Sequence, residues 1–421
     1  MQVQEVISVL GETGLTGAPG SEAWWQQVAM RGTPLHLSGT EKECDLLFLW
    51  RDPQGDETRS ATVRVYMDIN SVTDHHSPSP TSMQRLAGTD VWFWQVRVPS
   101  HWRGSYQLIP AQQEQQAPTP YDPEQHRAWW IRLMEGAIAD PLNPKLAQRS
   151  MWGGQLSALH MPDAPLQPGW ETVDRGEISQ PQDVIKLEWH SEQLHNRRDI
   201  WVYQSGVSHE SLPLVLLLDG RFWATGMPVF ATLAEQTSQG RLPAALYVLI
   251  DEIDSETRGQ ELPCNPTYWQ AIQAELLPLL AARWQFSDDP ARTLVAGQSY
   301  GGLAALYAAS HWPERFGCVL SQSGSFWWPD RSLFTSDPIH GRRPGCGGWL
   351  TSELRQRTIT PPLKVWLEAG TREGEMIDLS ETMSQVLASG DHDVLFRSFE
   401  GGHDRLCWRG GLIDGLRWLL S

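Results

Sequence analysis

Hydrophobic and polar positions alternate between about residues 44 and 110, which is the pattern of strands with one buried face. Hydrophobic residues occupy every second position of TVRVYMDI and of DVWFWQVRVP, at Val63, Val65, Met67 and Ile69 and at Trp92, Trp94, Val96 and Val98. Turns rich in Asp, Pro and Gly separate these runs. The pattern predicts an all-β N-terminal domain, an antiparallel sandwich of the immunoglobulin-like type.

The pattern changes in the C-terminal half, where hydrophobic residues form continuous runs. LPLVLLLDG and AALYVLIDE contain continuous apolar runs, as expected of strands buried on both sides of a parallel sheet. Helical segments such as PTYWQAIQAELLPLLAARW, with hydrophobic residues at every third or fourth position, lie between such runs. This alternation predicts a doubly wound, mostly parallel α/β sheet.

The boundary between the two patterns falls in Pro-rich sequence. ADPLNP at 139–144 and HMPDAPLQPGWE at 160–171 are typical of connections rather than of regular elements. We therefore expect a β-sandwich domain at residues 1–160 and an α/β domain at residues 175–421. A length of 421 residues also favours two hydrophobic cores over one.

Composition limits the classes of partner and the compartment. A net charge of −17 does not favour binding to nucleic acid or to an anionic membrane surface. The sequence contains no run of about 18 apolar residues, so it predicts no membrane span. The sequence MQVQEVISVLGETG lacks the features of a secretion signal. Five scattered cysteines without a C-x-x-C pair indicate reduced thiols. We expect a cytoplasmic protein.

The strongest chemical motif is Gly297-Gln298-Ser299-Tyr300-Gly301, a G-x-S-x-G sequence between the apolar run LVA and a helix of small residues. In this context the motif predicts a nucleophile elbow, a sharp turn that exposes the serine hydroxyl at the end of a strand. Ser299 is the predicted nucleophile of an α/β-hydrolase.

A base and an acid should follow the nucleophile along the chain. His403 lies in the Gly-rich sequence EGGHD near the end of the chain, where a loop can bring its imidazole to Ser299. The sequence LEAGTREGEMID offers the acid. We favour Glu373, which follows the strand end, over Glu368, which is expected inside the strand, and Asp378, which could instead cap the next helix.

An oxyanion hole requires two backbone N–H groups that point at the developing negative oxygen. The residue after the nucleophile, Tyr300, provides one of them. The loop after the early strand LLLDG provides the second, which we assign to the backbone of Arg221.

Together, LLLDGRFW, DEIDSETRGQEL, the Ser299 elbow, SQSGSFWW, LEAGTREGE and EGGHD resemble the enterochelin (ferric enterobactin) esterases over nearly the whole chain. The resemblance implies an immunoglobulin-like domain, with a suspected role in covering the substrate, before an α/β-hydrolase domain. It also implies hydrolysis of the trilactone ester bonds of a tri-catecholate siderophore to release iron in the cytoplasm. Ser299, His403 and Glu373 would take the catalytic positions.

Such a substrate is anionic and carries three flat rings, so cations and aromatic side chains should line its site. The candidates are Arg221, Arg258, Trp223, Trp327 and Trp328. The alternatives are that Asp251, Asp254 and Glu261 hold Arg258 by ion pairing, and that the tryptophans pack in the core. The 22 tryptophans of the chain are also consistent with a site for flat ligands.

The sequence contains no ligand-spaced metal motif, so we expect no cofactor and no protein-held metal, and iron would arrive with the substrate. The triad alone does not separate this function from an esterase of the feruloyl or esterase D type. An acyltransferase on the same fold, or a binding protein with a degenerate hydrolase fold, also remains an alternative.

Overall fold

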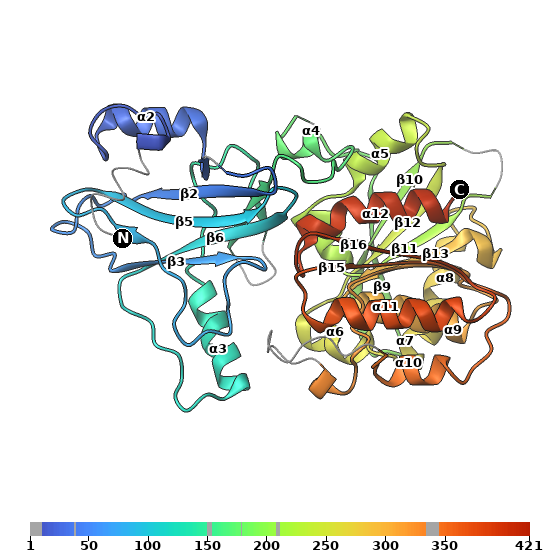
Figure 1. Cartoon of the computed structure of the whole chain (residues 1–421). Coiled ribbons are helices and arrows are strands. Elements are labelled where there is room, and N and C mark those ends of the chain that lie inside the picture. Colours follow the sequence, from blue (N-terminus) through green and yellow to red (C-terminus); the bar gives the residue numbers. More distant parts are fainter. Residues whose placement is uncertain (1–10, 38, 150–153, 178, 208–210, 334–344) are drawn as a thin grey trace. The chain divides into compact units, whose positions relative to one another are not determined.

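A computed structural model describes residues 11–37, 39–149, 154–177, 179–207, 211–333 and 345–421 (Figure 1). The chain divides into two compact units, Met1–Pro165 and Leu166–Ser421. We call them the N-terminal unit and the C-terminal unit.

The N-terminal unit contains two four-stranded sheets whose neighbouring strands run antiparallel. The first sheet has the order β1 (Leu35–His36), β2 (Glu43–Arg51), β5 (Val91–Pro99) and β4 (Gln84–Arg85). The second has the order β3 (Arg64–Ile69), β6 (Arg103–Ala111), β8 (Gln155–His160) and β7 (Gln148–Arg149). Side chains from both sheets, including Phe48 and Met67, share one buried core, so the predicted sandwich is confirmed.

Each sheet of the N-terminal unit also has a helix on its outer face. Helix α2 (Glu22–Arg31) is capped by Ser21 and packs Trp24 against Leu47 of β2. Helix α3 (Pro123–Met134) packs Trp129 against the second sheet. The outer faces are therefore buried too, which is why these strands carry hydrophobic residues at some of the positions expected to be polar.

The C-terminal unit is built on one eight-stranded sheet in the order β16-β15-β14-β13-β11-β12-β10-β9. The six strands from β16 to β12 are parallel, and β10 and β9 form an antiparallel hairpin at the edge. Their bounds are β9 Ile185–Ser191, β10 Asn196–Ser205, β11 Leu214–Leu217, β12 Ala245–Ile250, β13 Thr293–Gln298, β14 Cys318–Gln322, β15 Lys364–Gly370 and β16 Asp393–Phe399.

Helices cover both faces of this sheet, as the continuous apolar runs predict (Figure 1). In β11, for example, Leu216 faces one core and Val215 the other. One side carries α7 (Pro266–Ala271), α8 (Leu277–Ala281), α9 (Tyr300–His311), α10 (Trp349–Leu354) and α11 (Glu375–Ala388). The other side carries α4 (Glu171–Asp174), α5 (Phe230–Ser238) and α12 (Arg405–Leu419). This is the predicted doubly wound arrangement of an α/β-hydrolase.

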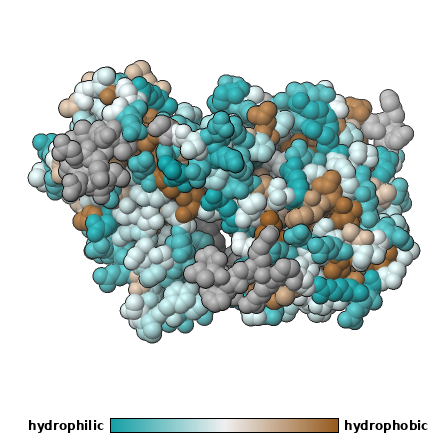
Figure 2. Space-filling model, in the orientation of Figure 1, coloured by the Kyte–Doolittle hydropathy of each residue, from teal (hydrophilic) through white to brown (hydrophobic). Residues whose placement is uncertain are grey.

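The remaining helical segments are short. They are η1 (Phe222–Gly226), α6 (Ser255–Glu261), η2 (Ile272–Leu276), η3 (Pro290–Arg292) and η4 (Arg331–Leu333). None of the helices in the described ranges has the length and hydrophobicity needed to cross a membrane. Figure 2 shows polar residues over much of the visible face, with hydrophobic residues in small separate groups.

Candidate active site

Ser299 lies on a strained turn between β13 and α9. Its backbone has φ 58° and ψ −119°, a conformation that L-residues rarely adopt and that recurs at functional turns. A Cβ atom on Gly297 would come within 2.4 Å of the backbone of Gly301, so the two glycines of the motif allow this close approach. The strand–turn–helix context predicted for Ser299 is confirmed.

The turn that follows β14 holds Ser299 in place. The Ser299 N–H donates to the Gln322 carbonyl at 3.0 Å, and the Ser325 N–H donates to the Ser299 carbonyl at 3.0 Å. The Ser299 Oγ lies 3.3 Å from the Ser325 Oγ, and Ser299 remains partly exposed. The hydroxyl is therefore fixed through its backbone and still accessible.

The structure brings His403 and Glu373 together. The His403 Nδ1 lies 2.7 Å from the Glu373 Oε2, although the residues are 30 positions apart in the chain. The Glu373 side chain is 1% exposed and that of His403 is 43% exposed. The Glu373 Oε1 accepts from the Gly370 N–H at 2.7 Å, so the carboxylate is fixed on both oxygens. An exposed imidazole is thus oriented by a buried acid.

The two other candidate acids are engaged elsewhere. Glu368 is inside β15, as expected, and accepts from Arg397 at 2.8 Å. Burial raises the pKa of Glu368. Asp378 lies in the first turn of α11, but Gly374 is the N-cap, so the capping role considered for Asp378 is wrong. Of the three acids, Glu373 is the one in hydrogen-bond contact with His403.

Ser323 and Trp408 complete the arrangement, and sequence reasoning assigned neither a role. The Ser323 Oγ donates to the Glu373 Oε1 at 2.6 Å and accepts from the Trp408 Nε1 at 2.8 Å. The Trp408 ring lies edge-on to His403 at 4.6 Å. Because Ser323 directly follows Gln322, one turn contacts both Ser299 and the acid that orients His403. The Ser-rich motif SQSGS, at the end of β14 and the turn after it, was the available signal.

The two backbone N–H groups predicted to form the oxyanion hole differ in whether they already donate a hydrogen bond. The Tyr300 N–H begins α9, where the first turn leaves amide groups without intrahelical partners. The Arg221 N–H instead donates to the Glu252 Oε2 at 3.3 Å. Burial raises the pKa of Glu252, as do the nearby Asp219 and Asp251 carboxylates. The Arg221 amide can serve an oxyanion only after Glu252 releases it.

The two predicted substrate-binding arginines also differ. The Arg221 side chain is 46% exposed while it contacts Asp251 at 2.7 Å. Arg258 is 12% exposed and pairs with Asp219, whose Oδ2 accepts from the Arg258 Nη2 at 2.8 Å. Arg258 also donates to the Gln298 carbonyl at 3.2 Å, directly before Ser299.

Arg258 therefore supports the nucleophile turn rather than presenting a free cation to a ligand, and its prediction as a substrate contact is corrected. The acids predicted to form an ion pair with Arg258 are also wrong, because its partner is Asp219. Of the three acids proposed to hold Arg258, Asp251 pairs with Arg221 and Glu261 pairs with Arg198. Burial would raise the pKa of Asp219, but the Arg258 guanidinium outweighs it and holds that pKa below its usual value.

The prediction that Trp223 contacts the substrate is wrong. Trp223 is 0% exposed, and its Nε1 donates to the Gln298 Oε1 at 2.9 Å, so it packs beneath the nucleophile strand. Trp327 and Trp328 are partly exposed. The Trp327 ring lies 5.7 Å from that of Tyr300. These two remain candidates for contact with a flat ligand.

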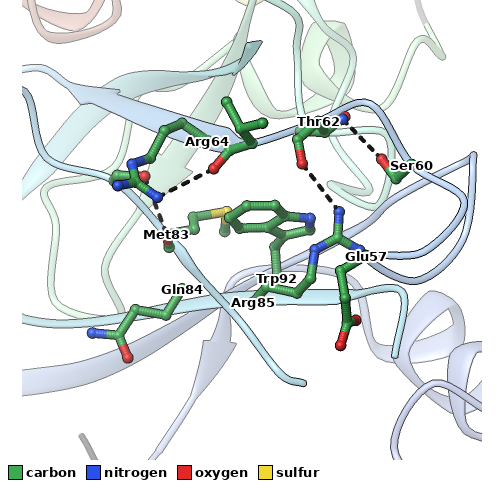
Figure 3. Close-up of a pocket in the computed structure, with 10 residues that line it drawn as sticks. Glu57, Ser60, Thr62, Arg64, Met83, Gln84, Arg85 and Trp92 are labelled. Carbon is green, nitrogen blue, oxygen red and sulfur yellow. Dashed lines mark hydrogen bonds between the residues drawn. The ribbon is translucent and has the colours of Figure 1, made fainter. Parts of the chain in front are cut away.

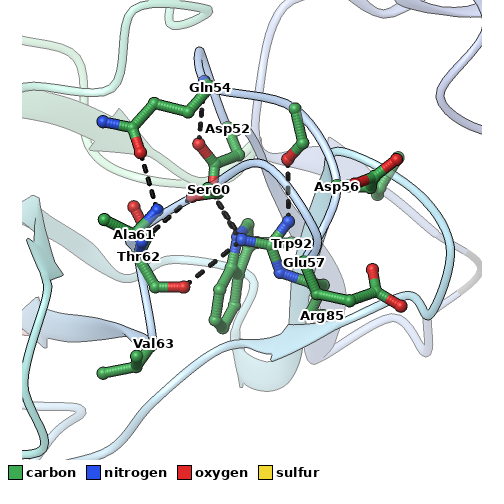
Figure 4. Close-up of polar contacts among 12 residues, drawn as sticks. Asp52, Gln54, Asp56, Glu57, Ser60, Ala61, Thr62, Val63, Arg85 and Trp92 are labelled. Carbon is green, nitrogen blue, oxygen red and sulfur yellow. Dashed lines mark hydrogen bonds and ion pairs between the residues drawn. The ribbon is translucent and has the colours of Figure 1, made fainter.

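The N-terminal unit contains a cavity of about 540 Å³ lined by Trp92, Arg85, Glu57 and their neighbours (Figure 3). Its polar groups are already paired. Asp52 accepts from the Ser60 Oγ at 2.6 Å and from Arg85 at 2.5 Å, and the Arg85 Nη1 donates to the Gly55 carbonyl (Figure 4). We find no exposed nucleophile or base in this network, and we assign it a structural role.

In the described part of the chain, no group of three or more His, Cys, Asp or Glu side chains is arranged to hold a metal ion. The expectation that the protein holds no metal or cofactor stays a prediction.

Comparisons with known proteins cover both units. A family model described as "Enterochelin esterase, N-terminal" matches residues 45–170, and one described as "Putative esterase" matches residues 191–419. The chain is 51% identical to the iron(III) enterobactin esterase of Dickeya dadantii, over 96% of this chain and 93% of the relative. It is 45% identical to that of Escherichia coli K12, over 94% of this chain and 96% of the relative.

One solved structure is similar to this chain over nearly its whole length. The enterobactin esterase of Shigella flexneri, crystallised in the presence of enterobactin, has a TM-score of 0.83 and 43% identity to this chain. The match covers 96% of this chain and 99% of that one.

Proposed function

The chain belongs to the enterochelin (iron(III) enterobactin) esterase family, and from that premise we propose that it hydrolyses the trilactone ester bonds of ferric enterobactin-type catecholate siderophores. Membership makes it a carboxylic ester hydrolase. The observation that carries the proposed mechanism is the 2.7 Å contact between the His403 Nδ1 and the Glu373 Oε2.

That contact supports the following roles for the triad residues. With its Nδ1–H donated to Glu373, the neutral imidazole keeps Nε2 as the acceptor for the Ser299 proton. The Ser299 Oγ then attacks the ester carbonyl, and the Tyr300 N–H stabilises the oxyanion. The imidazolium returns the proton to the leaving alkoxide, which departs as an alcohol. Water, deprotonated by His403, then attacks the acyl-enzyme, and the imidazolium returns the proton to the Ser299 Oγ as the acid leaves.

Two further parts of the site fit this substrate. The exposed Arg221 guanidinium provides positive charge for an anionic ferric complex, and Trp327 and Trp328 provide ring surfaces for catechols. Iron enters with the substrate, and no cofactor takes part. Linear esters are the first products.

We place the reaction in the cytoplasm and expect neither nucleic acid nor membrane as a partner, given the net charge of −17. An esterase of the feruloyl or esterase D type, or an acyltransferase on the same fold, is not favoured. Relatives that are 45% to 51% identical to the chain over at least 94% of its length are named iron(III) enterobactin esterases.

The test is a substrate comparison with purified protein. Ferric enterobactin, a p-nitrophenyl ester and a feruloyl ester are supplied in parallel, and products are separated by chromatography. We expect the largest kcat/KM for ferric enterobactin, with linear dihydroxybenzoyl-serine oligomers as products. A larger kcat/KM for the feruloyl ester would overturn the proposal. Ser299→Ala is the control for activity from contaminating esterases.

A further inference from the structure

Arg405 has an incomplete set of contacts beside the triad. It is the first residue of α12 and lies two positions after His403. Its Nε is buried and has no hydrogen-bond partner, while the residue as a whole stays partly exposed. Within the described ranges, no ion pair or hydrogen bond engages its guanidinium. A buried donor without a partner is costly, so such a group is a candidate for contact with a ligand.

The position of Arg405 connects two loops of the site. Its guanidinium carbon lies 3.8 Å from the centre of the Phe222 ring. Phe222 begins η1 and directly follows Arg221, the predicted oxyanion residue. The Arg405 side chain therefore reaches from the His403 loop to the loop after β11. A guanidinium that packs over a ring keeps its N–H groups available for hydrogen bonds.

The acids near Arg405 already accept hydrogen bonds from other groups. The Asp219 carboxylate accepts from Arg258, and the Glu252 Oε2 accepts from the Arg221 N–H. Asp404 caps α12 by accepting from the Leu406 N–H. Burial lowers the pKa of Arg405 to about 10, Arg258 acts in the same direction, and the three acids oppose it. Arg405 thus stays charged at neutral pH, balanced at a distance but not by contact.

We propose that Arg405 is a specificity-determining residue that donates hydrogen bonds to the anionic catecholate oxygens of the ferric substrate. The inference rests on the proposed function. Two adjacent catecholate oxygens match the paired N–H groups of a guanidinium, as a carboxylate does. This role is distinct from that of Arg258, whose N–H groups are used by Asp219 and the Gln298 carbonyl.

The test compares a charged substrate with neutral ones. Arg405→Gln and Arg405→Lys are assayed on ferric enterobactin, on iron-free enterobactin, whose catechols are protonated at neutral pH, and on a p-nitrophenyl ester. For Arg405→Gln we expect KM for the ferric complex to rise about tenfold to a hundredfold, with kcat little changed. The KM for both neutral substrates should change little. Arg405→Lys, which keeps the charge but loses the paired geometry, should give an intermediate KM.

Arg417→Gln is the matched control, because Arg417 lies near the other end of α12 and its Nε is also buried without a partner. It should leave KM for the ferric complex unchanged. If wild-type protein cleaves ferric enterobactin and neither Arg405 variant changes its KM, this inference alone is overturned. Equal losses on charged and neutral substrates would also overturn it. Failure of the wild type to cleave ferric enterobactin would overturn the proposed function as well.

Discussion

Asp52 in the N-terminal unit and Glu373 in the C-terminal unit are both buried acids, with side chains 0% and 1% exposed. Each accepts a hydrogen bond of 2.6 Å from a serine, Ser60 in one case and Ser323 in the other. They differ in the third partner. Asp52 binds Arg85, which is 11% exposed and donates its remaining bonds to backbone carbonyls. Glu373 binds His403, which is 43% exposed.

This difference separates a structural network from a chemical one. The Asp52 network closes on itself, so every charge is neutralised by another group of the fold. The Glu373 network includes an exposed imidazole that can exchange a proton with a ligand. A buried acid with a serine partner therefore does not by itself mark an active site. What marks the active site is an exposed titratable group that contacts the buried acid.

Removal of the Ser299 hydroxyl gives the largest expected effect. Ser299→Ala should lower kcat by at least about 10³-fold, because covalent attack is lost while binding contacts remain. The transition temperature measured by calorimetry should not fall, since the Ser299 side chain is partly exposed. Unchanged kcat with normal folding would exclude Ser299 as the nucleophile.

Loss of the negative charge at Glu373 should have the next largest effect. Glu373→Gln should lower kcat by about 10²- to 10⁴-fold, because the imidazolium loses its counter-charge and His403 its preferred tautomer. Glu368→Gln is the matched control, since Glu368 is equally buried but bound to Arg397 and Gln322. Glu368→Gln should lower the free energy of unfolding and have little effect on kcat. The reverse ranking of the two kcat losses would assign the acid role to Glu368.

The corresponding change in the N-terminal unit should affect stability alone. Asp52→Asn removes the charge that pairs with Arg85 and should destabilise the protein by about 2 kcal/mol. Denaturant unfolding measures this loss, and kcat on a p-nitrophenyl ester should stay at the wild-type value. A kcat loss as large as that of Glu373→Gln would remove the distinction between the two networks.

The smallest expected effect is on the stability of the protein at acid pH. Burial would raise the pKa of Asp52, but hydrogen bonds from Ser60, the Gln54 N–H and Arg85 outweigh it and hold that pKa below its usual value. The resulting stability is present above about pH 4 and is lost as the pH falls through the lowered pKa. Wild-type protein should therefore lose stability below about pH 4 more steeply than Asp52→Asn. Parallel pH profiles of unfolding free energy would contradict this.

The sequence predicts well the features that are local in the chain. The Ser299 elbow lies in one stretch that contains its strand, turn and helix, so its context needs no tertiary information. The hydrophobic patterns of the strands in the two units, and the position of His403 after the last strand, are equally local. The choice of Glu373 needed only the end of β15 in addition, at Gly370.

Contacts between distant segments could not be predicted in the same way. Arg258 pairs with Asp219, which lies 39 positions before it, rather than with an acid close to it in the sequence. Trp223 follows a strand, as a ligand-contacting residue would, but its indole turns inward to Gln298. Ser323 acquires its role from Glu373, in the loop after β15, and from Trp408, in α12. In each case the partner is chosen by tertiary packing, which the local pattern does not encode.

The most direct test of the account is to identify the serine that a fluorophosphonate probe modifies, by mass spectrometry of the digested protein. We predict a single adduct on Ser299, formed much more slowly in Glu373→Gln. Ser325, whose hydroxyl lies 3.3 Å from that of Ser299, should stay unmodified. An adduct on Ser325 or Ser323 with Ser299 intact would contradict the proposed triad.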